Sequence, residues 1–297
     1  MVTFYRRLPK FDYIRPDSIE EVLRRLADNV NGKYKIYAGG TDVVPKLKAR
    51  ETPKPEILID LKGIPNLDYI DYDEKKGLRI GALATVRSVA TSPIVSEKFP
   101  ILSQAAGRIA STQVQNRGTI AGNICSAVPS ADSAPALLCL EARVIGVKKD
   151  GERAIGIDAF FKGPNKTVLD PDELLKEIQI PPMPESSHGV YIKLSPRSRM
   201  DLAVVGVAAV LGVRDRIVRH IKIGLGAVSP TPMRAREAEN MLWKKKIDDE
   251  LITKSARRAM EESRPISDHR ASAEYRKMMV EVLVDRAIHQ ALAGSSS

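Results

Sequence analysis

The chain has 297 residues, of which 43% are hydrophobic and 28% charged, an ordinary globular composition that excludes intrinsic disorder and a collagen-like fold. Its net charge is +10, but basic and acidic residues alternate along both halves, so we expect a solvated surface and no nucleic-acid binding. The longest apolar run, from Leu202 to Val213, is too short to span a membrane, and no secretory signal core is recognisable near the N-terminus. We therefore expect a cytoplasmic protein with no membrane span.

The first part of the chain mixes predicted helices and strands. Residues 17–29 fit an amphipathic helix whose start, Ser18 with Glu21, matches a capping box. Residues 33–38 predict a strand that ends at a glycine pair, and a short helix is expected directly after it. Further strands are expected at 56–60 and 78–83, and further helices at 85–95 and 100–110.

The second part of the chain has a different organisation. Proline and glycine become frequent between residues 163 and 185, which predicts a domain boundary there. We place one domain at residues 1–178 and the other at 179–297. The second domain has an α+β arrangement, strands first and helices after them, and Gly294 should stop its last helix. Its predicted strands are 190–194, 202–213 and 217–228, and its predicted helices are 233–243, 248–263 and 271–292.

The two cysteines limit what the chain can bind by itself. Cys125 and Cys139 are too few for a disulfide framework, a four-cysteine iron–sulfur cluster or a structural zinc site. We expect both to be small buried hydrophobic residues in a reducing compartment. The four histidines have no metal-ligand spacing, so we predict no metal site in this chain.

Two glycine-bearing turns are the best candidates for a ligand site. The dinucleotide fingerprint Gly-x-Gly-x-x-Gly, the Walker A loop and the zinc motif His-Glu-x-x-His are absent from the sequence. The first turn, residues 38–42, lies between a predicted strand and a predicted helix. The second turn, residues 118–123, is followed by Pro129-Ser130-Ala131-Asp132. Taken alone, each turn fits an ordinary structural turn better than a site.

Together, the two turns could hold a diphosphate. Glycines let a backbone approach a phosphate closely, and the amides of a turn can point at it. A diphosphate that bridges both turns would be held mainly by neutral donors. Asn123 and Asp132 would then be available as acceptors for a ribose or ribityl chain.

The flanks of these turns carry a family resemblance. The stretches AGGTDVVPKLKAR (38–50) and NRGTIAGNICSAVPSADSAPALLCLEARV (116–144) resemble the FAD-binding subunit of the xanthine dehydrogenase, carbon monoxide dehydrogenase and aldehyde oxidoreductase family of molybdenum hydroxylases. The segments FDYIRPDSIEEVLRRL (11–26), DELLKEIQIP (172–181) and EYRKMMVEVLVDRAI (274–288) resemble the same subunit. The resemblance extends over nearly the whole chain.

The resemblance implies a mixed α/β fold of the α+β class. Its N-terminal FAD domain, of the vanillyl-alcohol-oxidase type, would have two α/β lobes. Its smaller C-terminal domain would have an antiparallel sheet and three helices, and FAD would lie between the parts.

The resemblance also assigns residues to FAD. Residues 38–42 would form the first pyrophosphate loop and residues 119–123 the second, while Asp132 would contact the ribityl chain or the ring. Leu175 would lie against the isoalloxazine or adenine part, and Lys193 would approach the flavin. The full set is Ile36, Tyr37, Ala38, Gly39, Gly40, Thr41, Asp42, Val43, Gly118, Thr119, Ile120, Ala121, Gly122, Asn123, Asp132, Leu175 and Lys193.

Two positions depart from the family pattern. Gln115 stands where the family often has an arginine, and Ala121 stands where it often has a second glycine. The extra methyl group of Ala121 is expected close to the cofactor, where it would alter the fit without abolishing binding.

The function implied by the resemblance is electron transfer in a heteromeric molybdenum hydroxylase. A large partner subunit would hold the molybdenum cofactor, and a small one two [2Fe–2S] clusters, in a heterotrimer or its dimer. Electrons would pass through FAD in this chain to NAD⁺, a quinone, oxygen or a carrier protein. We name no catalytic side chain, because the cofactor supplies the redox chemistry.

Two alternatives remain open at this stage. One is a self-sufficient FAD oxidoreductase of similar fold, which should have a buried acid, base or nucleophile over the flavin. The other is a basic binding module without enzymatic activity, whose binding should be salt-sensitive.

Overall fold

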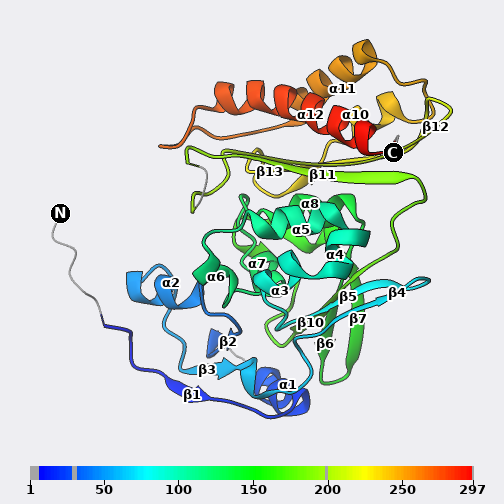
Figure 1. Ribbon diagram of the computed structural model, residues 1–297. Helices are drawn as coiled ribbons and strands as arrows, with labels where there is room; N and C mark the ends of the chain where they lie inside the picture. The colour runs from blue at the N-terminus through cyan, green and yellow to red at the C-terminus, as the bar shows by residue number, and fades with distance from the viewer. Residues whose placement is uncertain (1–6, 29–31, 198–199, 296–297) are drawn as a thin grey trace.

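The computed structural model describes residues 7–28, 32–197 and 200–295. Figure 1 shows two small sheets at the bottom of the view, a layer of short helices above them, and a third sheet with its own helices at the top. This is the mixed α/β architecture expected from the sequence.

The first lobe is a small parallel sheet. Its strands β1 (Asp12–Ile14), β3 (Ile57–Asp60) and β2 (Tyr34–Tyr37) lie side by side in that order. The helices α1 (Ile19–Ala27) and α2 (Val43–Ala49) complete the lobe. A short 3₁₀ helix, η2 (Leu61–Gly63), follows β3 directly.

The capping box predicted for α1 is wrong. Ser18 does take the N-cap position with an extended backbone, but its side chain makes no capping hydrogen bond to a described amide. Glu21 lies 3.8 Å from Arg25, one turn further along the helix. The helix is stabilised instead through its apolar face, where Val22 and Leu26 are buried.

The second lobe is built on an antiparallel sheet. Its five strands follow the order β4-β5-β10-β6-β7, so β10 lies in the middle of the sheet although it is the last of the five along the chain. Helices from the intervening chain pack above the sheet (Figure 1). The strands are β4 (Ile70–Asp73), β5 (Gly77–Gly81), β6 (Arg143–Lys148), β7 (Gly151–Gly156) and β10 (Leu174–Ile180). The helices are α3 (Val86–Thr91), α4 (Pro93–Lys98), α5 (Pro100–Gly107), α6 (Thr112–Gln115), α7 (Ile120–Cys125), α8 (Ser133–Cys139) and α9 (Ile157–Phe160). A short ribbon of β8 (Phe161–Gly163) and β9 (Lys166–Thr167) completes the lobe.

The single helix predicted over 85–95 is two helices, α3 and α4. Ser92 between them has an extended backbone, with φ −65° and ψ 124°. A proline disfavours the helical conformation of the residue before it, and Pro93 then begins the next helix.

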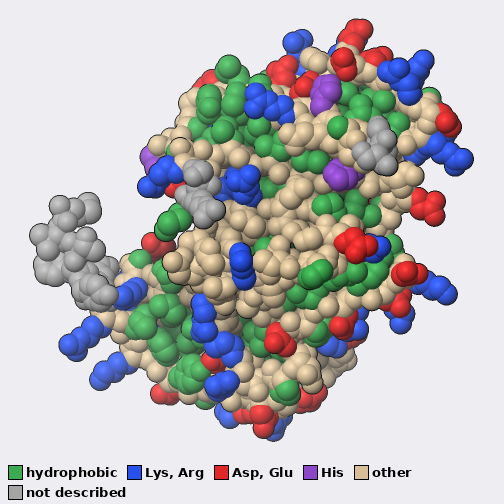
Figure 2. Space-filling model, viewed as in Figure 1, with side chains coloured by type: hydrophobic (Ala, Val, Ile, Leu, Met, Phe, Trp, Pro, Cys, Tyr) green, Lys and Arg blue, Asp and Glu red, His purple; other side chains and the backbone are tan. Residues whose placement is uncertain are grey.

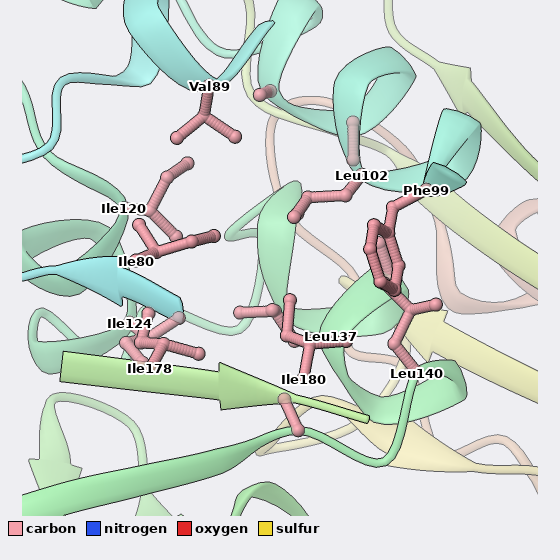
Figure 3. Close-up of a cluster of buried hydrophobic side chains, with 14 of the residues drawn as sticks. Ile80, Val89, Phe99, Leu102, Ile120, Ile124, Leu137, Leu140, Ile178 and Ile180 are labelled. Carbon is pink, nitrogen blue, oxygen red and sulfur yellow. The ribbon is translucent and has the colours of Figure 1, made fainter. Parts of the chain in front are cut away.

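An apolar core joins the sheet of the second lobe to its helices. Figure 3 shows Ile80 of β5 and Ile178 of β10 next to Ile120 and Ile124 of α7, in the same apolar cluster. All four of these side chains are fully buried. This core fixes the helix layer that carries the second glycine turn.

The C-terminal domain has the predicted antiparallel sheet and three helices. The strands β11 (Ser187–Leu194), β12 (Val205–Arg214), β13 (Ile217–Gly226) and β14 (Met233–Arg234) follow in chain order. Helices α10 (Arg236–Leu242), α11 (Asp249–Glu262) and α12 (Ala273–Ser295) lie on the outer side of the sheet (Figure 1). Because α12 continues through Gly294, the predicted stop at that glycine is wrong.

The C-terminal sheet is covered on both faces. Helices α5 and α8 of the N-terminal part lie beneath the sheet in Figure 1, with α10 to α12 above it. A β-carbon on Gly224 of β13 would lie only 2.5 Å from the Pro135 carbonyl oxygen of α8, so sheet and helix meet backbone to backbone. Double coverage explains why the first eight residues of β12 are all buried.

The predicted division between residues 178 and 179 falls inside β10, which continues to Ile180. Among the described residues, no helix combines the length and the apolar content that crossing a bilayer requires.

Candidate functional site

The two glycine turns, far apart in sequence, meet in the structure. The first turn links β2 to α2, and the second links α6 to α7. The Thr41 Oγ1 atom lies 3.3 Å from the position that a β-carbon on Gly118 would take. The Ser126 hydroxyl, just beyond α7, donates a hydrogen bond to the Asp42 carboxylate. The contact brings the first lobe against the second at the place where the sequence predicted a shared site.

The glycines of the first turn serve this contact. A β-carbon on Gly39 would lie 2.1 Å from the carbonyl oxygen of Arg117, which is far too close. Gly40 has a φ of +73°, and its β-carbon would lie 2.2 Å from Cε2 of Tyr37. We expected these glycines to leave room for a phosphate. The structure gives a different reason for these glycines: the space that a β-carbon would need is occupied by the second turn at Gly39 and by the Tyr37 ring at Gly40.

The turns nevertheless present hydrogen-bond donors. The backbone amides of residues 39–43 have no hydrogen-bond acceptor among the described residues, and the same holds for the amides of Thr119 and Ala121. The amide of Gly122 is already used, since it donates to Thr119 Oγ1 at 2.9 Å. Free amides on two facing turns suit the oxygen atoms of a diphosphate. The residues present therefore fit the pyrophosphate of FAD.

Asp132 and Lys193 form a buried ion pair beside the turns. Lys193 Nζ lies 2.8 Å from Asp132 Oδ2, and the exposed fractions of the two side chains are only 6% and 7%. Tyr191 donates a hydrogen bond of 2.7 Å to Asp132 Oδ1, and Lys193 also donates to the carbonyl of Arg108 at 3.0 Å. Asp132 precedes α8, whereas Tyr191 and Lys193 belong to β11. The pair thus joins the N-terminal part to the C-terminal sheet.

Burial raises the pKa values of two hydrogen-bonded side chains here, Asp132 and Tyr191. It raises the pKa of Asp132, against the opposing effects of Lys193 and Tyr191. Burial and the neighbouring Asp132 carboxylate raise the pKa of Tyr191 well above its usual value. Tyr191 is therefore a neutral donor throughout the physiological range.

The remaining predicted residues lie around this centre in different environments. The Asn123 Oδ1 atom accepts a hydrogen bond of 2.6 Å from Ser133, so one acceptor expected to face a ribose already has a partner. Ile120 and Ala121 are buried in the apolar core of the second lobe. The Ala121 methyl group, expected close to the cofactor, therefore packs into that core. Leu175 belongs to the same core and is 4% exposed. Ile36, Tyr37 and Val43 are half-buried.

The Gln115 side chain hydrogen-bonds to two nearby backbone carbonyls. It is 5% exposed, and its Nε2 donates to the carbonyls of Ile109 and Gly107 at 2.8 and 3.2 Å. A neutral amide satisfies both carbonyls inside a buried loop, which accounts for glutamine at this position.

Sequence reasoning missed residues that complete the site. Tyr191 is 59 residues from its partner Asp132, and Ser126 is 84 residues from Asp42. Lys62, from η2, donates to the carbonyl of Ala38 in the first turn. No local motif marks any of these, because each acts through a contact made only on folding.

The cysteines and acidic residues offer no metal site. Among the described residues, no group of three or more His, Cys, Asp or Glu side chains could hold a metal ion. Both cysteines are free, and Cys139 is buried as predicted. The prediction that Cys125 is buried is wrong: it ends α7 at the surface.

Comparison with known proteins supplies the class of protein. Residues 9–183 match the family model described as the FAD binding domain in molybdopterin dehydrogenase. Residues 190–291 match the model described as the CO dehydrogenase flavoprotein C-terminal domain. The fold is thus that of an FAD-binding oxidoreductase subunit, with an FAD-binding domain followed by a C-terminal domain.

Individual relatives agree over nearly their full length. The glyceraldehyde dehydrogenase medium chain of Sulfolobus acidocaldarius is 33% identical over 282 residues, which cover 95% of this chain and 98% of that one. The carbon monoxide dehydrogenase medium chain of Hydrogenophaga pseudoflava is 34% identical over 285 residues, covering 96% and 98%. The chain belongs to the FAD-binding medium subunits of the molybdenum hydroxylase family.

Solved structures of related enzymes also match this chain over nearly its whole length. A chain of carbon monoxide dehydrogenase from Hydrogenophaga pseudoflava superposes with a TM-score of 0.92 at 34% identity, covering 97% of this chain and 99% of that one. A chain of quinoline 2-oxidoreductase from Pseudomonas putida 86 gives a TM-score of 0.91 at 30% identity, with coverages of 98% and 100%. The family resemblance predicted from the sequence is confirmed.

Proposed function

We propose that this chain is the electron-transferring FAD subunit of a heteromeric molybdenum hydroxylase. It would accept electrons from the [2Fe–2S] clusters of a small partner subunit and deliver them to an external acceptor. A large partner subunit would hold the molybdenum cofactor and oxidise the substrate. The observation that carries the proposal is the meeting of two glycine turns with free amides, one from each lobe.

The chain's own residues have binding and positioning roles in this proposal. The free amides of residues 39–43, with those of Thr119 and Ala121, would hold the diphosphate. Asp132 and Lys193 would lie beside the ribityl chain and the ring, in an orientation fixed by Tyr191. Leu175 would add an apolar contact. FAD supplies the redox chemistry when bound, so no general base is assigned to the protein.

We also propose that the domains divide close to the predicted position, just after β10. Keeping the five-stranded sheet whole places the division between Ile180 and the start of β11 at Ser187. Three prolines in residues 181–184 suit a connecting segment.

Partner subunits follow from the same proposal. The relatives are named medium chains and medium subunits, which is the basis for proposing a heterotrimer or its dimer. Two cysteines are too few for an iron–sulfur cluster, so partner subunits would carry the iron, and two free thiols suit a reducing cytoplasm. On the visible face in Figure 2, Lys and Arg side chains are interspersed with Asp and Glu, which suits a solvated surface.

The first test is the visible spectrum of the purified full chain, with chromatographic identification of the released cofactor. We expect FAD. A folded, colourless chain that takes up no added FAD would refute cofactor binding.

The second test is co-expression with genes encoding the large and small subunits. We expect a complex that contains molybdenum and iron. A chain that stays monomeric with both partners present would refute the subunit assignment while leaving FAD binding intact.

A further inference from the structure

Lys62 contacts the first glycine turn from the side of the small parallel sheet. It lies in η2, directly after β3. Its Nζ atom donates to the Ala38 carbonyl at 3.0 Å and to Asp60 Oδ1 at 2.7 Å, and lies 3.9 Å from the centre of the Tyr37 ring. One ammonium group therefore contacts the first residue of the turn, a carboxylate and an aromatic ring.

The carboxylate partner of Lys62 is itself fixed. The Asp60 side chain is 2% exposed, and it also accepts hydrogen bonds from the Tyr13 hydroxyl and from the backbone amide of Lys62. Burial alone would raise the pKa of Asp60, but the hydrogen bonds from Lys62 and Tyr13 outweigh it and hold that pKa below its usual value. Asp60 is therefore a charged, buried and hydrogen-bonded partner for the ammonium group.

The ring contacted by Lys62 also contacts the turn. Gly40, with φ +73°, lies so close to Tyr37 that even a methyl group would overlap the ring. The ammonium group attracts the ring through a cation–π interaction. Lys62 thus acts on the turn in two ways, through the Ala38 carbonyl and through the ring packed on Gly40.

The hydrogen bond to Ala38 determines where a free amide points. In a trans peptide the C=O and the following N–H lie in one plane and point in opposite directions, and the described chain has no cis peptide bond. Holding the Ala38 oxygen toward Lys62 therefore directs the Gly39 N–H away from Lys62. That N–H is the first of the free amides of the turn.

We infer that Lys62 is a positioning residue for the diphosphate-binding turn. It fixes the 38–39 peptide plane and the Tyr37 ring, so that the amides of residues 39–43 are already oriented before a diphosphate arrives. This inference rests on the proposed function for the identity of the ligand. The orientation of the turn itself does not depend on the ligand.

The test compares FAD binding by the full-length apo-protein and three variants, measured by quenching of flavin fluorescence. Lys62→Met removes the donor and the charge, whereas Lys62→Arg keeps both. Lys35→Met is the matched control, because Lys35 is an exposed residue of β2, close to the same turn, and has no hydrogen-bond partner among the described side chains. We expect Lys62→Met to weaken FAD binding about tenfold, equivalent to ~1.4 kcal/mol, with much smaller effects for the other two.

The salt dependence separates positioning from long-range attraction. An oriented peptide plane keeps its effect when salt screens distant charges, so the difference between wild type and Lys62→Met should persist at about 0.5 M salt. The inference is overturned if Lys62→Met binds FAD as well as wild type. It is also overturned if the difference vanishes in salt, or if Lys62→Arg is as weak as Lys62→Met.

Hydrogen exchange of the apo-protein gives a readout that needs no ligand. We expect the amides of Val44 and Lys46, which donate to the Gly40 and Asp42 carbonyls of the turn, to exchange faster in Lys62→Met than in Lys35→Met, with unchanged exchange in β12. Equal exchange of these two amides in both variants would contradict the inference. If wild type binds no FAD, the proposed function fails, and this measurement still decides whether Lys62 orders the turn.

Discussion

Gly39→Ala should separate the two turns and weaken FAD binding. The new β-carbon would lie 2.1 Å from the Arg117 carbonyl oxygen and 2.7 Å from Gly118 Cα. Ordinary contact needs about 3.4 Å, so the turns would have to move apart by about 1.3 Å. Both obstructing atoms belong to the backbone and cannot rotate away as a flexible side chain would.

Gly39→Ala should lower both the stability of the protein and its affinity for FAD. Overpacking of this kind destabilises a protein by about 1–3 kcal/mol. A displacement of more than an ångström would also break part of the amide–phosphate hydrogen bonding, where each bond to a charged group contributes about 1.5–3 kcal/mol. We therefore expect FAD affinity to fall by roughly 30-fold, or about 2 kcal/mol.

The assay is a titration of apo-protein with FAD, alongside urea unfolding of each variant. Gly107→Ala is the matched control, because a β-carbon there has nothing within 4 Å. If Gly39→Ala matches Gly107→Ala in both affinity and free energy of unfolding, the reasoning about the contact between the turns is refuted.

Three further changes test other parts of the structure by urea unfolding. Asp132→Asn leaves the buried Lys193 ammonium without its counter-charge and should destabilise the chain by about 3–5 kcal/mol; a loss below about 1 kcal/mol would contradict a buried ion pair. Hydrogen bonds from the Arg270 amide and from Arg276, acting against desolvation, lower the pKa of Asp268 to about 2. Because this pKa lies below the usual 3.8, the charged Asp268 carboxylate stabilises the fold above about pH 4, and this stabilisation is lost as pH falls toward 2. Asp268→Asn should therefore be less stable than wild type at neutral pH and approach wild-type stability near pH 2. A difference in unfolding free energy that stays constant with pH would exclude this linkage. Phe99→Ala, in the fully buried core of Figure 3, should cost about 3–5 kcal/mol, and a near-neutral result would show that the site collapses around the loss.

Elements whose signal is local were predictable from the sequence. The alternation of apolar residues marks β13, and the helical apolar stripe marks α12, because each buries one face against a neighbour. The break between α3 and α4 was missed, because one helix was predicted over 85–95 although Pro93 disfavours a continuous helix there. The second strand of the C-terminal domain was expected to start at residue 202 but starts at Val205, since hydrophobicity alone does not show where pairing with β11 begins.

The site was predictable only in part. The turns were recognisable because glycine and small polar residues are needed wherever backbones approach closely. The sequence did not show why Gly39 and Gly40 must be glycines, because the atoms that exclude a β-carbon there belong to Arg117 and Tyr37 and not to a ligand. Contacts such as Lys62 with Ala38 arise from the parallel sheet, which places residues 24 apart in sequence beside one another.

The position of α8 limits how this chain can be cut or recombined. All seven residues of α8 are buried, and the C-terminal sheet packs directly on it. A truncated protein ending after β10 would turn this apolar helix outward and should aggregate. A chimera that takes its C-terminal half from another medium subunit would need an incoming β13 with a glycine at 224, because the backbone carbonyl of residue 135 in α8 leaves no room for a β-carbon there. Exchange of halves between relatives is therefore constrained by one short helix that belongs to the other half of the chain.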